Sequence, residues 1–489
     1  MSQFWILAPI VLPILGGVGI PLLPFRKRRQ MLIYIETVVL LTSGILWALL
    51  LGGTTETFHV VHFVNDLSIS FKIDGMTMVF AGLVAVLWPL ATLYAFEYMT
   101  HENHEKSFFL FYTVTYGVTL GIAFASDMMT MYFFYELLTL VTVPLVMHTL
   151  TREAILAVRK YLYVSIGGAA FALMGMIFLI VYGDTCEFVL GGVFSADALA
   201  RHGKLLLRIY LFSFMGFGVK AAIFPLSGWL PQAGVAPTPV TALLHAVAVV
   251  NAGAFAIIRL TYYSFGTDFL QGTWVQNVCM ALAMFTIVYG CSRAVKETHI
   301  KRRLAWSTVS NLSYIVFGAV IMTPQGLVGA LAHFVFHGFM KITSFLCAGA
   351  FMHQTGKKYI YETDGLGKKM RIVFGCFAVS SFGLMGVPGF AGFISKWNLT
   401  EAAVNSGNPL AYVGVAALML SALLTAIYML GIVRRAFFPG RDTVCQETAG
   451  DPGWMMCLPL LVCAAATALL GLFSGPLIDF FRAIARGTL

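Results

Sequence analysis

Apolar runs of about twenty residues recur along the whole chain, and they limit its fold more than any other feature. As a helix, such a run spans roughly 30 Å of hydrocarbon. Only 11% of the 489 residues are charged, whereas soluble domains carry about 25%. We therefore predict an all-α integral membrane protein without a separate soluble domain.

The length criterion gives about fourteen transmembrane spans. We place them at residues 4–24, 31–52, 75–98, 108–126, 128–149, 161–182, 206–226, 239–263, 274–292, 304–322, 326–352, 372–395, 409–433 and 454–476. The first run lacks a basic segment before it and a clear cleavage signal, so we interpret it as a retained helix rather than a signal peptide.

Basic residues alternate between the connections and so predict the orientation. One set of connections carries most of them: Arg26, Lys27, Arg28, Arg29, Lys106, Arg152, Arg159, Lys160, Arg293, Lys296, Lys301, Arg302, Arg303, Lys357, Lys358, Lys368, Lys369, Arg371, Arg434, Arg435 and Arg441. The other set carries Lys72, Arg201, Lys204, Arg208, Arg259, Arg482 and Arg486. We expect a multi-pass protein of the inner (cytoplasmic) cell membrane with both termini on the outer side. The same bias explains the net charge of +9 without nucleic acid.

The eight cysteines are scattered and form no CxxC pair, which argues against a metal cage or an iron–sulfur centre. The sequence also contains no nucleophile constellation, phosphate-binding loop or metal motif. We therefore expect no cofactor in this subunit, no metal site and no catalytic residues of its own.

Two spans look interrupted, and each has a proline and a nearby lysine. The seventh reads GFGVKAAIFPLSGWLP, with Lys220 and Pro225, and the twelfth reads FGLMGVPGFAGFISKW, with Pro388 and Lys396. Interrupted helices in matching positions indicate an inverted-repeat transporter. Spans 4–8 and 9–13 would be the repeats, and an odd number of helices in each would turn the second copy upside down.

The domain boundaries follow from this division. We expect three N-terminal helices in residues 1–98, a first inverted repeat in 108–263, a second in 274–433 and a C-terminal helix in 454–489, all within one membrane domain. A kink at a helix end is the simpler alternative for each interruption.

Glu136 and Lys220 are ionisable residues within apolar spans, where a charge costs roughly 2.5–3.5 kcal/mol. A buried carboxylate and a buried lysine stabilise each other in the charged form. If the carboxylate moved away, the lysine would release a proton more readily. A purely structural carboxylate is the alternative for Glu136.

The eleventh span carries His333, His337 and Lys341 at spacings of four residues, so they share one helix face over about 12 Å. Three titratable groups in register are typical of a proton relay. With His245 in the eighth span and Lys396 beyond the second interruption, they predict a polar chain. Its members are Glu136, Lys220, His245, His333, His337, Lys341 and Lys396.

These segments resemble the antiporter-like subunit family of complex I, Mrp-type cation/proton antiporters and membrane-bound (energy-converting) hydrogenases. The resemblance rests on FFYELLTL, VKAAIFPLSGWLPQAGVAPTPVTALLHA, IKRRLAWSTVSNLSYI, HFVFHGFMKITSFL and GVPGFAGFISKW. It implies two inverted five-helix repeats and a regulatory ion pair between Glu136 and Lys220. It also implies that Lys341 is the central proton carrier and Lys396 the distal connecting group.

The resemblance further places His245, His333 and His337 at relay histidines of the distal complex I subunit, and Ser307 and Thr308 at polar positions that hydrate the path. Asn251 departs from the family, because many members have a lysine in that span. The chain ends at Leu489 without the long lateral helix of the distal complex I subunit, so we expect a compact member.

Three functions fit this pattern. The first is a proton-translocating subunit of a respiratory or hydrogenase-type complex, whose partners would be other membrane subunits and a redox arm with iron–sulfur centres. The second is a subunit of an Mrp-type Na⁺/H⁺ antiporter. The third is a membrane scaffold recruited to another transport process.

Overall fold

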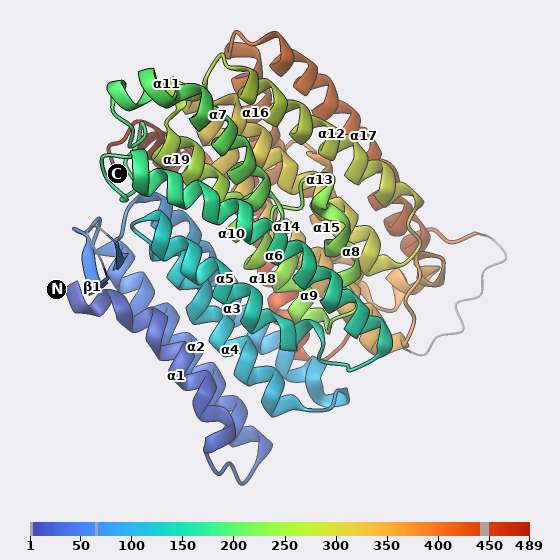
Figure 1. Ribbon diagram of the computed structural model, residues 1–489. Coiled ribbons are helices and arrows are strands. Elements are labelled where there is room, and N and C mark those ends of the chain that lie inside the picture. The colour runs from blue at the N-terminus through green and yellow to red at the C-terminus, as the bar shows by residue number, and fades with distance from the viewer. Residues whose placement is uncertain (1–2, 64–66, 441–448) are drawn as a thin grey trace.

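The computed structural model describes residues 3–63, 67–440 and 449–489 (Figure 1). Arg441 and Cys445 lie outside the described residues. The N-terminal part contains α1 (Ala8–Leu22), α2 (Arg28–Leu51), β1 (Phe58–His62), β2 (Ser68–Phe71) and α3 (Gly75–Tyr98). The first five-span half contains α4 (Glu105–Phe124), α5 (Met128–Val146), α6 (Arg152–Tyr182), α7 (Ala196–Gly218), α8 (Leu230–Ala233), α9 (Thr238–Ala246), α10 (Val249–Ile258) and a π-helical turn (Arg259–Phe265).

The second half has the same number of spans. After α11 (Thr267–Leu270) it contains α12 (Trp274–Lys296), α13 (Ile300–Ile321), α14 (Pro324–Thr355), α15 (Arg371–Met385), α16 (Ala391–Asn405) and α17 (Pro409–Phe437). The chain continues with α18 (Trp454–Leu472) and α19 (Gly475–Ala485).

Within the described residues, 12 helical segments are long and apolar enough to cross a membrane. The two remaining predicted spans are the interrupted ones. Four charged side chains lower the hydropathy of α7, and α15 and α16 have only 15 residues each. The all-α membrane fold with about fourteen spans is therefore confirmed. The N- and C-termini lie at the same end of the helices, beside the β1–β2 hairpin (Figure 1).

Both predicted interruptions are present. Helix α7 ends at Gly218, and residues 219–225 are not helical before a short 3₁₀ turn begins at Leu226. Helix α15 ends at Met385 and α16 begins at Ala391, with Gly386 and Gly389 at positive φ between them. Proline supplies no backbone donor, so each interruption coincides with a position where a helix ladder would fail.

The sequence analysis missed a third interruption, between α9 and α10. Val247 and Ala248 leave the helical conformation there, although neither is glycine or proline. The Asn251 side chain donates to the freed Ala246 carbonyl oxygen at 3.0 Å, which satisfies one backbone acceptor that the break exposes. The hairpin and the short amphipathic helix α19 were also not predicted.

Burial separates interior from peripheral helices. The apolar windows of α9–α10 and α13 are 100% buried and that of α14 is 94% buried, whereas those of α6 and α17 are 33% buried. Polar caps fix where the helices begin: Asp127 accepts from the Thr130 amide at 2.7 Å and Asp74 from the Thr77 amide at 2.9 Å. The predicted histidines and Lys341 all lie on interior helices, His245 on α9 and the others on α14.

Candidate functional site

Glu136 and Lys220 lie next to each other, as predicted. Glu136 belongs to α5, and Lys220 lies in the non-helical segment after α7. The Lys220 Nζ is 3.9 Å from the Glu136 Oε1, and the two side chains are 1% and 25% exposed respectively. The lysine is therefore enclosed by protein, while the carboxylate lies nearer the surface.

The interruption of the seventh span brings Lys220 onto α5. Its ammonium donates to the Tyr135 carbonyl oxygen and lies 3.3 Å from the centre of the Tyr135 ring. The Tyr135 hydroxyl donates in turn to the Phe217 carbonyl oxygen at 3.1 Å. On the other side, Gly253 of α10 packs so closely that a Cβ atom there would lie 2.3 Å from the Ala221 nitrogen. Carbonyl, ring and carboxylate together stabilise the charged lysine.

His245 lies on α9, directly before the break that the sequence analysis missed. Its ring is fully buried and stacks on Phe345 of α14 with 4.7 Å between ring centres. Neither ring nitrogen has a hydrogen-bond partner among the described residues. The imidazole interacts electrostatically with Lys341 and Lys301. His245 is thus a buried titratable group with both nitrogens free to bind a proton or water.

His333, His337 and Lys341 share one face of the uninterrupted helix α14, as their spacing predicts. The two histidine rings are 5.9 Å apart, and all three side chains are fully buried. His333 Nδ1 lies 2.9 Å from the Ser395 hydroxyl, whereas both nitrogens of His337 lack a protein partner in the described ranges. The ring of Tyr314 stacks on His333 at 5.1 Å.

Lys341 has different hydrogen-bond partners from Lys220. Its ammonium donates to the Ser307 hydroxyl at 2.6 Å and to the Leu304 carbonyl oxygen at 3.3 Å. In the described part of the chain, no carboxylate lies within salt-bridge distance of it. A fully buried ammonium without a counter-ion is costly, which favours release of its proton.

Lys396 is the sixth residue of α16, close to the second interruption. Its ammonium donates to the carbonyl oxygens of Leu384 and Met385 at 2.6 and 3.0 Å, the two residues at the C-terminal end of α15. Helix C-termini attract cations. The same ammonium lies 5.4 Å from the centre of the Tyr314 ring. Tyr314 therefore contacts both His333 and Lys396.

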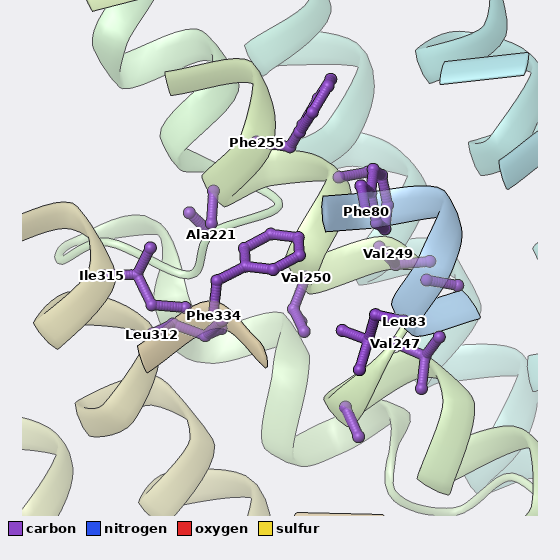
Figure 2. Close-up of a cluster of buried hydrophobic side chains, with 14 of the residues drawn as sticks. Phe80, Leu83, Ala221, Val247, Val249, Val250, Phe255, Leu312, Ile315 and Phe334 are labelled. Atoms are coloured by element: carbon purple, nitrogen blue, oxygen red, sulfur yellow. The ribbon is translucent and has the colours of Figure 1, made fainter. Parts of the chain in front are cut away.

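The predicted chain is not one continuous hydrogen-bonded line. Figure 2 shows an apolar cluster that includes Ala221, which follows Lys220, and Phe334, which follows His333. Val250 of α10 belongs to the same cluster. Apolar neighbours of Lys220 and of His333 therefore belong to one cluster. No hydrogen bond between described residues joins the Glu136–Lys220 pair to Lys341, so the two sites would influence each other through an electrostatic field or water.

Three basic residues that the charge pattern assigns to connections are buried, which the pattern alone does not predict. Lys301 is 3% exposed and donates to the Ala236 carbonyl oxygen at 2.6 Å. Arg303 is 6% exposed and donates to three backbone carbonyl oxygens. Arg259 is 1% exposed and forms an ion pair with Asp74 at 2.7 Å. Each has at least one partner more than sixty residues away in the sequence, namely Ala236 for Lys301, Tyr428 for Arg303 and Asp74 for Arg259, so their burial could not be predicted from position near a span end.

Two titratable groups, Glu102 and His299, lie near the surface at the end of the helices that is rich in basic residues. Burial raises the pKa of Glu102, against the attraction of Lys301 and His101. Burial, with the charges of Lys301 and Arg302, lowers the pKa of His299 to about 4. Within the described ranges, no three His, Cys, Asp or Glu residues gather as a metal site requires. The lack of a cofactor remains a prediction.

Comparison with known proteins now identifies the family. A family profile described as "NADH:quinone oxidoreductase/Mrp antiporter, TM" matches residues 125–435, which is more than half of the chain. The chain belongs to this family. A second profile, described as "NADH-Ubiquinone oxidoreductase (complex I), chain 5 N-terminus", matches residues 62–109. The matched region of this antiporter family contains both buried lysine sites.

Relatives from several complexes resemble the whole chain. NADH-quinone oxidoreductase subunit N of Desulforudis audaxviator is 28% identical, over 88% of this chain and 87% of that protein. A chain of the Mrp complex from Dietzia sp. is 20% identical and covers 99% of this chain and 97% of its own, with a TM-score of 0.84. A chain of the archaeal membrane-bound sulfane sulfur reductase is 22% identical, covers 98% and 96%, and has a TM-score of 0.85.

At these identities the two solved structures establish the fold of the family. The predicted resemblance is confirmed, and the chain is a multi-pass, antiporter-like membrane subunit. These relatives are parts of multisubunit membrane complexes. The role of each buried residue is a separate question, to which the geometry around Lys341 is the best guide.

Proposed function

We propose that this chain moves protons across the membrane as one subunit of a larger redox-driven complex. The single observation that carries the proposal is the setting of Lys341, which is fully buried and bonded to neutral oxygens alone among the described residues. A lysine in such a place is stable either as an ammonium with an opposite charge nearby or as a neutral amine that has lost its proton. A movable field can therefore switch its protonation.

The Glu136–Lys220 pair supplies that field. When the carboxylate lies beside Lys220, the pair is close to neutral at a distance. If the pair opens, the unbalanced lysine charge acts on the buried groups beyond the apolar cluster, including His245 and Lys341. Like charges disfavour each other, so Lys341 would release its proton. The carriers in this proposal are Glu136, Lys220, His245, His333, His337, Lys341 and Lys396.

The complex would contain further membrane subunits and a redox arm with iron–sulfur centres, and this subunit would hold no cofactor and perform no catalysis itself. The alternation of basic connections supports a place in the inner membrane with both termini on the outer side. The domain limits proposed from the sequence, 108–263 and 274–433, fit the positions of the interrupted spans.

The test uses the native complex, purified with its partners and inserted into vesicles. Proton uptake is followed with a pH-sensitive dye while NADH with quinone, reduced ferredoxin, hydrogen or a sodium gradient is supplied in turn. The substitution Lys341→Met should abolish uptake and leave the complex assembled. Full uptake by the Lys341→Met complex, with the driving reaction intact, would refute the proposal.

Exchange of Na⁺ for H⁺ is the second candidate, favoured by the family profile and by the fold shared with the Mrp complex. In that case a sodium gradient alone would drive proton movement in the same vesicles. A redox substrate that drives uptake in the absence of sodium would exclude this second function. Neighbouring genes for a hydrogenase or for iron–sulfur subunits would favour the first.

A further inference from the structure

Lys341 is the starting point of a ladder of buried hydroxyl groups that the predicted relay does not use. Its proton acceptor is Ser307 Oγ, at 2.6 Å. Ser307 is hydrogen-bonded to the Tyr428 hydroxyl at 2.6 Å, and Tyr428 donates to Thr425 Oγ1 at 3.1 Å. All three hydroxyl residues are at most 1% exposed. These groups connect α13 with α17, a helix that supplies none of the predicted carriers.

A thiol continues the ladder. The Cys291 Sγ of α12 lies 3.6 Å from the Thr425 Oγ1 and 2.9 Å from the Ser421 Oγ. The Thr425 hydroxyl itself donates to the Ser421 carbonyl oxygen at 2.7 Å, so the thiol is the side-chain bridge between these two hydroxyls in the described structure. Ser310 closes the group, 3.1 Å from both the Ser421 oxygen and the Cys291 sulfur.

The far end of the ladder reaches the residues around Lys396. The Tyr314 hydroxyl donates to the Leu418 carbonyl oxygen at 3.2 Å, and its side chain lies near Ser421, three residues further along α17. The ring of the same tyrosine stacks on His333 and lies under the Lys396 ammonium. From Tyr428 to Ser421 the ladder climbs α17 by about 10 Å. It leads away from Arg434 and Arg435, which mark the basic end of that helix.

We propose that Ser307, Tyr428, Thr425, Cys291, Ser421 and Tyr314 form a proton-conducting branch from Lys341 toward Lys396. The inference rests on the proposed function. Hydroxyl and thiol groups can each accept one hydrogen bond and donate another, as a relay of this kind needs. By contrast, both ring nitrogens of His337 and the Nε2 of His333 have no partner among the described residues, so Lys341 has no direct bond to the histidine line.

The proposed transfer moves protons and no electrons. The Lys341 ammonium loses one proton to Ser307, which passes its own hydrogen to the Tyr428 oxygen. Each following group forms one bond to hydrogen and breaks another. The Thr425 hydroxyl turns from the Ser421 carbonyl oxygen to the Cys291 thiol, and the thiol passes its own hydrogen to the Ser421 hydroxyl. In the proposed last steps, Ser421 passes a proton to the Tyr314 hydroxyl, which turns from the Leu418 carbonyl oxygen. Water then carries a proton to the Lys396 amine, which must be neutral to accept it. One proton leaves Lys341 and one arrives at Lys396, without oxidant or reductant.

The decisive variant is Thr425→Val, which keeps the shape of the side chain and removes its hydroxyl. In the vesicle assay it should lower the proton uptake rate on the order of tenfold or more. Thr425→Ser, which restores the hydroxyl, should restore uptake. Thr467→Val is the matched control, because Thr467 is equally buried on α18 and bonds the carbonyl oxygen four residues earlier, as Thr425 does. This control should not slow uptake.

Three further variants keep the test decisive if Thr425→Val fails to assemble. Cys291→Ala removes the bridge and should slow uptake, whereas Cys291→Ser keeps a donor and acceptor there and should not. Tyr428→Phe removes one hydroxyl and keeps the ring. Uptake by Thr425→Val equal to that of Thr467→Val, or failure of Thr425→Ser to restore it, would overturn the ladder.

The companion variant Lys341→Met separates the two proposals. If it abolishes uptake while the hydroxyl variants remain fully active, the proposed function stands and the ladder is wrong. If Lys341→Met itself retains full uptake, the proposed function fails, and the ladder with it.

Discussion

Lys220 in the first half and Lys341 in the second half are both buried amines, and their surroundings differ in one decisive respect. Lys220 lies in an interruption of its helix, 3.9 Å from a carboxylate that is 25% exposed. Lys341 lies within the continuous helix α14, fully buried, and its ammonium is bonded to two neutral oxygens. The first lysine can keep its charge as long as its partner stays close. The second can lower its energy by passing its proton on.

The comparison teaches that the two halves are suited to different tasks. A carboxylate near the periphery can respond to a neighbouring subunit, so the first site suits signalling. A lysine attached to a hydroxyl ladder has somewhere to send a proton, so the second site suits transfer. No hydrogen bond between described residues joins the two sites, and apolar neighbours of Lys220 and His333 lie together in the cluster of Figure 2.

A carboxylate introduced at the second site should change proton uptake more than any other substitution discussed below. In Ser307→Asp the new carboxylate would lie beside the Lys341 ammonium, and an opposite charge at that distance favours the charged lysine. Lys341 would then hold its proton, and uptake in the vesicle assay should fall on the order of tenfold or more. Ser307→Asn is the neutral control of similar size. If Asp and Asn variants transport equally, charge at this position does not control transfer.

A double-mutant cycle tests whether the first site is a coupled pair. Glu136→Gln and Lys220→Met should each lower the thermal stability of the complex, and the double variant should lose less than the sum. We expect an interaction of about 0.5–3 kcal/mol, because the two groups share one ion pair. Glu136→Gln with Thr467→Val should instead be additive, because no contact and no proposed field joins those two residues. Additivity in both cycles would mean that Glu136 and Lys220 are not a coupled pair.

The close packing around Lys220 predicts a smaller effect, a loss of folding stability when Gly253 is enlarged. Gly253→Ala would place a methyl group 2.3 Å from the Ala221 nitrogen, so backbone must move. Overpacking of this kind costs about 1–3 kcal/mol of unfolding free energy. Gly431→Ala is the control, because its methyl group would meet no atom within 4 Å. Denaturant unfolding measures both. Equal stability of the two variants would mean that α10 does not hold the Lys220 segment in place.

The smallest effect concerns pH and His299, at the start of the second half. Its pKa falls from 6.5 to about 4, through burial and the nearby cations Lys301 and Arg302. Between these pH values the unfolded chain binds a proton that the folded chain does not, so folding stability falls as pH drops from 6.5 to 4. His299→Gln should remove this dependence, by at most about 1 kcal/mol because the ring is partly exposed. Unfolding midpoints at pH 7 and 5 measure it.

Much of this architecture could be predicted because membrane burial leaves strong marks in a sequence. Lys220 and Lys341 stand out from long apolar runs, and Pro225 and Pro388 mark two interruptions. The break at Val247 carries no such mark, because β-branched and small residues are also common inside helices. The burial of Lys301 depends on the Ala236 carbonyl oxygen, which only the folded chain brings near.

The hydroxyl ladder was beyond sequence analysis for the same reason. Serine and threonine occur on most spans and usually bond their own helix backbone. Which of them face each other depends on how α12, α13 and α17 pack. Ser307 was placed near the path by family resemblance, but nothing in the sequence distinguished Thr425 or Cys291 from the many similar residues on other helices.

The central claim is that protons cross the second half through an interior route that begins at Lys341. The most direct test is a structure of the assembled complex at a resolution that reveals ordered water. The account predicts water bonded to the free ring nitrogens of His245 and His337, and between Tyr314 and Lys396. Dry apolar contacts at all these atoms, with the Lys341 ammonium turned away from Ser307, would contradict it.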